Sequence, residues 1–145
     1  MGVPGSVLAI DHGQKRTGFA VADRERIVTT PLEVWHGPGD GDELLEHVAE
    51  LLAERDVGAI VVGHPLDMDG GEGPRALAVR TFVTRLRERF PGVAVALQDE
   101  RLTTKEAEDL LREAGHHGAA RRSRRDSWSA LVILREWLGA GEPLP

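Results

Sequence analysis

The sequence contains no cysteine and no tyrosine, and it has only three phenylalanines and three tryptophans in 145 residues. Without cysteine, neither a disulfide framework nor a thiolate zinc site can form. The low aromatic content argues against a nucleic-acid interface built on base stacking. No apolar run is long enough to span a bilayer, and the N-terminus lacks the pattern of a signal peptide. These absences predict a cytoplasmic protein without a membrane segment.

The net charge of -6 is distributed unevenly along the chain. Lys15 and Arg16 form one basic pair, and a dense basic tract consists of Arg121, Arg122, Arg124 and Arg125. Phosphate binding depends on such local clusters more than on the total charge. The alternative interpretation of the tract is a solvated loop.

The length of 145 residues is that of one domain, and we expect residues 1–145 to form one, with 139–145 as a flexible tail. Short apolar runs bounded by turn residues predict buried strands at 7–10, 18–22, 59–62 and 93–97. A third, weaker strand is expected from Ile27-Val28 and from Leu32 to Trp35. Because Pro31 cannot donate to a ladder, that strand is expected at an edge.

Helical spacing of apolar residues predicts helices between and after these strands. Asp42 is expected to cap the first, which ends near Arg55, and Pro74 to begin the second, with Leu77 on its apolar face. The Thr103/Glu106 spacing predicts a third through about Glu113. A polar linker is then expected over 115–125, with Asp126 opening the last helix.

This order of elements predicts an α/β protein with a mixed sheet and helices on its faces. If the first, fourth and fifth strands are parallel neighbours, their carboxyl ends meet at one edge, where ligands of open α/β sheets bind. Asp11 and Glu100 follow two of these ends, so we expect them to face each other. Asp126 is the first candidate for a third acid, and Asp67 and Asp69 in the glycine-rich loop compete for that role.

Carboxylates gathered at one site repel each other unless a cation is present. Oxygen ligands without cysteine favour Mg²⁺ or Mn²⁺, which can support phosphodiester cleavage. Each acid also has a simpler explanation: Asp11 as a turn cap, Glu100 as a partner of Arg101, and Asp126 as a helix N-cap. His12 and His64 are expected at the same edge and could assist a proton transfer. His36, His47, His116 and His117 are expected in solvated loops or on a helix face.

Four segments in order carry a resemblance to a known family: Asp11–Gly18 (DHGQKRTG), Gly63–Gly70 (GHPLDMDG) followed by Arg75, Asp99–Thr104 (DERLTT), and Asp126–Ala130 (DSWSA). The chain resembles the YqgF (RuvX) family, relatives of the RuvC Holliday junction resolvases within the RNase H-like superfamily. The match covers nearly the whole length.

The resemblance implies an RNase H-like fold, a five-stranded mixed sheet of order 3-2-1-4-5 with helices on both faces. It implies that Asp11, Glu100 and Asp126 form an acidic triad that binds Mg²⁺ or Mn²⁺. It also implies a nuclease that processes the 5′ end of pre-16S ribosomal RNA. We expect its phosphate contacts to come from the nearby cations Lys15, Arg16, Arg75 and Arg101 and from the basic tract Arg121, Arg122, Arg124 and Arg125.

Three other functions stay open at this point. A Holliday junction resolvase would differ in substrate, with branched DNA in place of structured RNA, and would need two active sites in a homodimer in place of a monomer. A non-catalytic RNA-binding module would keep the fold without cleavage. An actin-like ATPase shares the Asp-x-Gly strand turn but needs two such domains around its nucleotide.

Overall fold

The computed structural model describes residues 3–100, residue 109 and residues 118–145, and for 118–127 it describes the helical backbone alone. Apart from residue 109, the predicted helix over 103–113 lies outside the described residues, as do His116 and His117. The elements are β1 (Ser6–Asp11), β2 (Arg16–Ala22), β3 (Thr29–Pro31), β4 (Trp35–His36), α1 (Asp42–Arg55), β5 (Val57–His64), α2 (Pro74–Arg89), β6 (Ala94–Asp99) and α4 (Gly118–Gly139).

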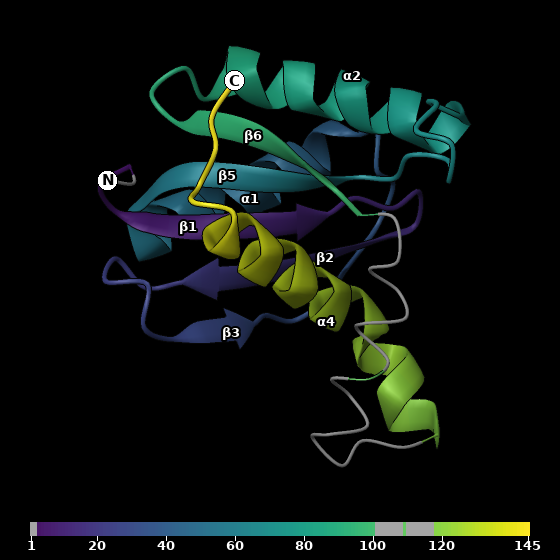
Figure 1. The fold of residues 1–145 in the computed structure, drawn as a ribbon, viewed down its shortest axis with the longest axis horizontal. Helices are drawn as coiled ribbons and strands as arrows, with labels where there is room; N and C mark the ends of the chain where they lie inside the picture. The colour runs from purple at the N-terminus through teal and green to yellow at the C-terminus, as the bar shows by residue number, and fades with distance from the viewer. Residues whose placement is uncertain (1–2, 101–108, 110–117) are drawn as a thin grey trace.

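One mixed sheet organises the molecule (Figure 1). Its main path runs β3-β2-β1-β5-β6, which confirms the predicted order of the five strands. β1 pairs antiparallel with β2 and parallel with β5, and β5 pairs parallel with β6. The carboxyl ends of β1, β5 and β6 therefore meet at one edge, as the sequence predicted.

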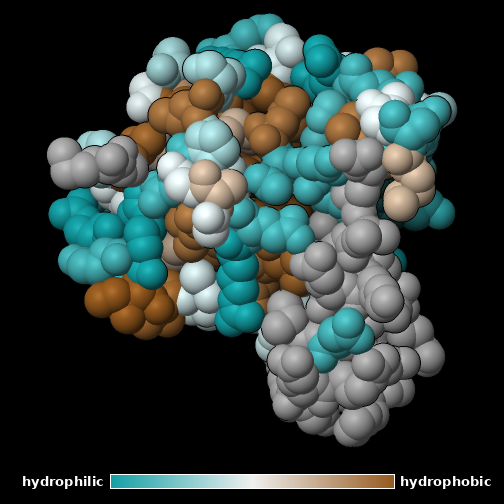
Figure 2. All heavy atoms as spheres, in the orientation of Figure 1, coloured by the Kyte–Doolittle hydropathy of each residue, from teal (hydrophilic) through white to brown (hydrophobic). Residues whose placement is uncertain are grey.

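The sheet has a sixth strand, because the predicted third strand is two short ones. β3 and β4 each pair with β2, at different positions along it. Ile27 and Val28 belong to neither, since the Asp23 carboxylate accepts both of their backbone amides (2.7 and 3.0 Å) in a turn. Both side chains are exposed, and a hydrophobic patch marks this turn at the lower left of Figure 2. Pro31 lies in the edge strand β3, as predicted.

Helices cover both faces of the sheet, which confirms the predicted layers (Figure 1). Because alternate residues of a strand face opposite sides, Leu8 and Ile10 of β1 pack with α1 and α2. Val7 and Ala9 instead pack with α4, which contributes Trp137 to this side of the core. Small residues such as Ala9 on the α4 side let that helix lie close to the sheet.

α1 and α2 begin and end near their predicted bounds, with two differences. Gly41, not Asp42, is the N-cap of α1, and Asp42 in the first turn accepts a hydrogen bond from Arg85 (2.7 Å). α2 begins at Pro74 as predicted, but Leu77 is exposed. The Leu77 prediction was wrong because Leu77 lies outside the buried face of the helix, which is formed by Ala76, Val79, Phe82, Val83 and Leu86.

α4 begins eight residues earlier than predicted, at Gly118. The expected basic linker over 115–125 is therefore wrong for 118–125, and Asp126 lies inside the helix instead of at its start. Alanine and arginine are strong helix formers, and the segment from Ala119 to Arg125 consists of these residues and one serine. Leu131 and Leu134 face the sheet, as their spacing predicted. The first turns of α4 extend beyond the sheet (Figure 1).

Arg26 holds the two ends of the described chain together. Its guanidinium donates to the carbonyl oxygens of Val3 and Gly5 (both 2.7 Å) and to the Glu142 carboxylate (3.0 Å). Trp137 also binds the tail, by donating to the Pro143 carbonyl. None of the helices in the described part of the chain is long and apolar enough to cross a membrane.

Candidate functional site

Asp11 and Glu100 both lie at the carboxyl edge of the sheet. Ile10 pairs with Val62 in the parallel register, so Asp11 lies at the level of Gly63. By strand alternation Asp11 is on the α4 face, the face of Val7 and Ala9. Glu100 follows β6, and its amide donates to the carbonyl of His64 (3.1 Å), the last residue of β5.

Gly63 makes room for the Glu100 carboxylate. A Cβ at Gly63 would lie 2.5 Å from Oε2 of Glu100 and 2.5 Å from Cδ1 of Ile133 in α4, closer than real contacts allow. The Glu100 carboxylate therefore occupies the space between the sheet and α4 that a side chain at position 63 would fill. Glu100 thus lies on the same face and at the same level of the sheet as Asp11.

Burial makes the Glu100 carboxyl group a weaker acid than usual. Loss of water raises its pKa from 4.5 to about 7, the Arg75 guanidinium lowers it, and Asp99 raises it further. Even beside Arg75 this carboxyl is therefore only partly ionised at neutral pH, and a metal ion bound to it would favour the ionised form. The environment of Glu100 therefore fits a site that holds a metal ion, and its oxygen donors suit Mg²⁺ or Mn²⁺.

Asp126 is placed by its backbone alone. It lies in α4, seven residues before Ile133, which is two helical turns or roughly 10 Å along the axis. Its side chain is outside the described part of the structure. Within the described residues, no three His, Asp or Glu side chains are placed to hold a metal ion. The described members of the predicted triad are thus Asp11 and Glu100.

Arg75 joins this edge to the β1–β2 loop. Its Nη2 donates to the carbonyl of His12 (2.7 Å) and to Nδ1 of the His12 ring (3.0 Å). Since arginine can only donate, Nδ1 accepts and the proton of His12 is on Nε2, which donates to the Gly39 carbonyl (2.8 Å). Burial, with Arg75 adding to it, lowers the pKa of His12, so the ring is neutral. His12 therefore connects α2 to the loop at Gly39, and its assistance in a proton transfer stays a prediction.

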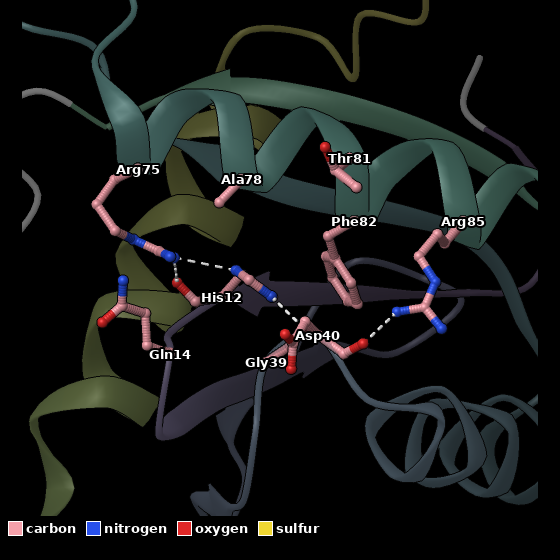
Figure 3. Close-up of a pocket in the computed structure, with 9 residues that line it drawn as sticks. All are labelled: His12, Gln14, Gly39, Asp40, Arg75, Ala78, Thr81, Phe82 and Arg85. Atoms are coloured by element: carbon pink, nitrogen blue, oxygen red, sulfur yellow. Dashed lines mark hydrogen bonds between the residues drawn. The ribbon is translucent and has the colours of Figure 1, made fainter.

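A cavity of about 490 Å³ opens beside Arg75, and we call it the α2 cavity. Figure 3 shows Arg75, Phe82 and Arg85 reaching from α2 toward the loops that carry His12 and Asp40. Phe82 stacks on the His12 ring, with centroids 4.4 Å apart. The lining residues are His12, Gln14, Gly39, Asp40, Arg75, Ala78, Thr81, Phe82 and Arg85.

A second cavity, of about 570 Å³, lies on the β1–β2 loop and is called the basic cavity. It is lined by Gly13, Gln14, Lys15, Arg16 and His36. Lys15, Arg16 and His36 are exposed, and none of the described residues in this lining is acidic. Gln14 belongs to both linings, so the loop separates the two cavities. The predicted phosphate contacts Lys15 and Arg16 thus share one surface.

The glycine-rich loop between β5 and α2 is held by its own acids. Asp69 accepts the Gly71 amide (2.8 Å), and Asp67 lies against Gly71 and Gly73. His64 donates to Glu72 (2.9 Å), which also pairs with Arg80 and whose pKa is lowered chiefly by the His64 hydrogen bond. These contacts hold the loop in place beside the acidic edge.

The remaining predicted basic residues divide into two groups. Arg101 lies outside the described residues. Arg121, Arg122, Arg124 and Arg125 lie in α4, and their side chains are outside the described part. Of the other histidines, His36 is exposed as expected. His47 is half-buried between the rings of Phe19 and Trp35.

Sequence reasoning missed Gly39, Asp40 and Arg85. One signal was available in α2, where Arg75, Ala78, Phe82 and Arg85 recur at helical spacing and so share one face. Gly39 had a weaker signal in its Gly/Pro-rich loop. A Cβ there would lie 2.2 Å from the Gly13 carbonyl, which shows why the two loops can meet.

Comparison with known proteins places this geometry in a family. The model of the family described as "RuvX: Holliday junction resolvase" matches residues 5–140. A protein of Sodalis glossinidius (strain morsitans) named "Putative pre-16S rRNA nuclease" is 39% identical over 95% of this chain and 96% of its own length. A protein of the same name from Anaeromyxobacter sp. (strain Fw109-5) is 45% identical over 90% of this chain and 94% of its own.

Solved structures share the fold at low identity. T. thermophilus RuvC in complex with a Holliday junction substrate gives a TM-score of 0.60 at 17% identity, over 97% of this chain and 99% of that one. Fowlpox virus resolvase, in complex with Holliday junction DNA, gives 0.59 at 10% identity, over 95% and 99%. The fold is therefore the RNase H-like fold of RuvC. By its match over nearly the whole length, the chain belongs to the RuvX family.

Proposed function

We propose that this protein is a divalent-metal-dependent endonuclease that hydrolyses phosphodiester bonds in structured RNA, at the 5′ end of pre-16S ribosomal RNA. The observation that carries the proposal is the Glu100 carboxylate, buried in the space at Gly63 and level with Asp11. The names of the relatives support the substrate. A ribosomal RNA substrate also implies that the protein acts in the cytoplasm.

The acidic edge is the proposed catalytic site. Asp11, Glu100 and Asp126 would hold Mg²⁺ or Mn²⁺, which when bound activates water and stabilises the leaving oxygen. Glu100 is supported by its burial, which makes its ionised form depend on a nearby cation. Asp126 is supported by its position two turns before Ile133, the α4 residue that contacts the same space at Gly63.

The basic residues are proposed to bind and orient the RNA backbone. Arg75 is fixed by two hydrogen bonds to His12 and acts on Glu100, so it would hold the phosphate nearest the acids. Lys15 and Arg16 would hold a phosphate further along, in the basic cavity. Arg101 and the tract Arg121, Arg122, Arg124 and Arg125 would extend this path.

Cleavage of a precursor ribosomal RNA tests the proposal. We expect the wild-type protein to cleave it with Mg²⁺ or Mn²⁺, and Asp11→Asn and Glu100→Gln each to lower the rate more than about 100-fold without unfolding the protein. Glu88→Gln, an exposed position on α2, is the matched control and should cleave at the wild-type rate. Undiminished cleavage by Asp11→Asn would refute the proposed site.

A Holliday junction resolvase is the second candidate, favoured by the description of the family model. A four-way DNA junction, tested beside the precursor RNA under the same metal conditions, separates the two substrates. Resolution of a symmetric junction needs two active sites, so the candidate also requires a dimer in sedimentation measurements. Binding of RNA without cleavage under any metal condition would instead indicate a non-catalytic binding module.

A further inference from the structure

The α2 cavity has no role in the proposed cleavage chemistry, yet it opens beside the acidic edge. Arg75 is common to both, since it lines the cavity and donates to the carbonyl of His12, the residue that follows Asp11. A strand whose phosphate lies at Arg75 would therefore pass the mouth of the cavity. We propose that the α2 cavity receives one unpaired nucleobase of the substrate strand, next to the phosphate that is cleaved. This inference rests on the proposed function.

The charge of the cavity suits a base better than a phosphate. Its lining holds two arginines, but Arg85 pairs with the Asp42 carboxylate and Asp40 adds a further negative charge. His12 adds no charge because its Nδ1 accepts a hydrogen bond from Arg75, so the charges of Arg75 and Arg85 are balanced by Asp40 and Asp42. A phosphate would meet repulsion from Asp40, whereas a neutral base would not.

The polar groups of the cavity match the edge of a base. The Gln14 amide can both donate and accept, the Asp40 carboxylate accepts, and the arginines donate. The Watson–Crick edge of an unpaired base likewise presents donors and acceptors side by side. Ala78 and Phe82 supply apolar surface for the ring. A volume of about 490 Å³ lies within the range of small-molecule sites.

The walls of the cavity are fixed before any ligand binds. His12 is held from both sides, by Arg75 and by the Gly39 carbonyl, and it stacks on Phe82. Arg85 is held by the Asp42 carboxylate and by the Asp40 carbonyl (both 2.7 Å), and a dashed line in Figure 3 marks the bond to Asp40. A preformed site loses little side-chain freedom on binding, which favours recognition of a single base.

Nucleoside 5′-monophosphates and ribose 5-phosphate separate the base from the phosphate. In the absence of divalent metal, we expect the nucleotides to shift the backbone NMR signals of Gly39, Asp40 and Thr81. Ribose 5-phosphate should shift those of Lys15, Arg16 and His36 alone. The inference is overturned if nucleotides and ribose 5-phosphate shift the same signals, confined to the basic cavity.

A matched pair of threonines tests the inference in RNA. Thr81 lines the cavity and Thr84 does not, yet both are exposed on α2 and both donate to the carbonyl four residues earlier. With a labelled single-stranded RNA and EDTA, Thr81→Trp should lower affinity about tenfold, and Thr84→Trp should leave it unchanged.

An abasic nucleotide scanned along the same RNA locates the base. One position should weaken wild-type binding about tenfold, and Thr81→Trp should no longer distinguish it from the intact RNA. Equal affinities of the two tryptophan variants, or an abasic profile without such a position, would overturn the inference. Because these measurements need no cleavage, a protein that binds in this way but never cuts would refute the nuclease and leave the base site standing.

Discussion

The basic cavity and the α2 cavity lie on the two sides of one loop and share Gln14, but they differ in charge and construction. The basic cavity is formed by exposed side chains of consecutive residues and of His36 on the paired strand β4. The α2 cavity is formed by three segments that are joined through buried contacts of His12. An exposed basic surface can follow any backbone, whereas a rigid, charge-balanced cavity can select what enters it. Their proximity suggests that one strand uses both.

Arg75→Met should have the largest effect, because Arg75 serves the α2 cavity and the acidic edge together. We expect single-turnover cleavage to fall by about 100-fold, since a fixed donor beside the reacting phosphate is lost. Arg85→Met removes a cation from the same cavity but not from Glu100, and should cost less. Equal losses in the two variants would mean that Arg75 acts through the cavity alone.

Glu100→Gln should stabilise the metal-free protein at high pH. The folded pKa of about 7 exceeds the ordinary 4.5, so the folded state binds more protons between these values and stability falls as pH rises through that window. Above pH 7 the variant should gain on the order of 1–3 kcal/mol in the free energy of unfolding. Urea denaturation from pH 4.5 to 8 measures this, with Glu88→Gln as control. Parallel pH profiles of wild type and Glu100→Gln would contradict the buried acid.

Gly39→Ala should damage the α2 cavity and lower the stability of the protein. Its Cβ would lie 2.2 Å from the Gly13 carbonyl and 2.9 Å from Nε2 of His12, so the loops must separate. Overpacking of this kind costs about 1–3 kcal/mol of stability. Gly92→Ala is the matched control, because its Cβ would meet nothing within 4 Å. If thermal unfolding shows the same loss of stability for Gly39→Ala and Gly92→Ala, the close approach of the two loops at Gly39 is contradicted.

Lys15→Gln should give the smallest effect, a modest loss of RNA affinity that depends on salt. Removal of one phosphate contact reduces the slope of log affinity against log salt by about 0.7 for a single strand. Thr81→Trp, in the α2 cavity, should weaken binding without changing that slope. Titrations at several salt concentrations make the measurement, and an unchanged slope in Lys15→Gln would remove the lysine from the phosphate path.

Much of the fold followed from local patterns in the sequence. The buried strands were recognisable because they are short apolar runs, and their order followed from the crossover helices and from the resemblance. The meeting of Asp11 and Glu100 at one edge followed from strand direction, which topology determines. The predicted strand at Ile27 and Val28 was wrong because of a local polar contact. The Asp23 carboxylate, instead of a neighbouring strand, accepts hydrogen bonds from both backbone amides.

The rest of the site depends on contacts between distant residues. Arg75 and His12 are 63 positions apart, and Arg85 and Asp42 are 43 apart, so no spacing rule connects them. The start of α4 was missed because a dense run of charges resembles a solvated linker, although arginine and alanine favour a helix. The cavities arise from the packing of segments that are distant in the sequence, so local sequence patterns do not predict them.

Arg26 couples the two ends of the described chain. One guanidinium holds the carbonyls of Val3 and Gly5 and the carboxylate of Glu142. Val3 and Gly5 precede β1, whose start lies at the left of Figure 1, opposite the carboxyl ends of β1 and β5. When either end loosens, the other loses the same anchor. The two ends should therefore open as one cooperative unit, with amide hydrogens that exchange at a common rate, while the site at the far edge stays closed.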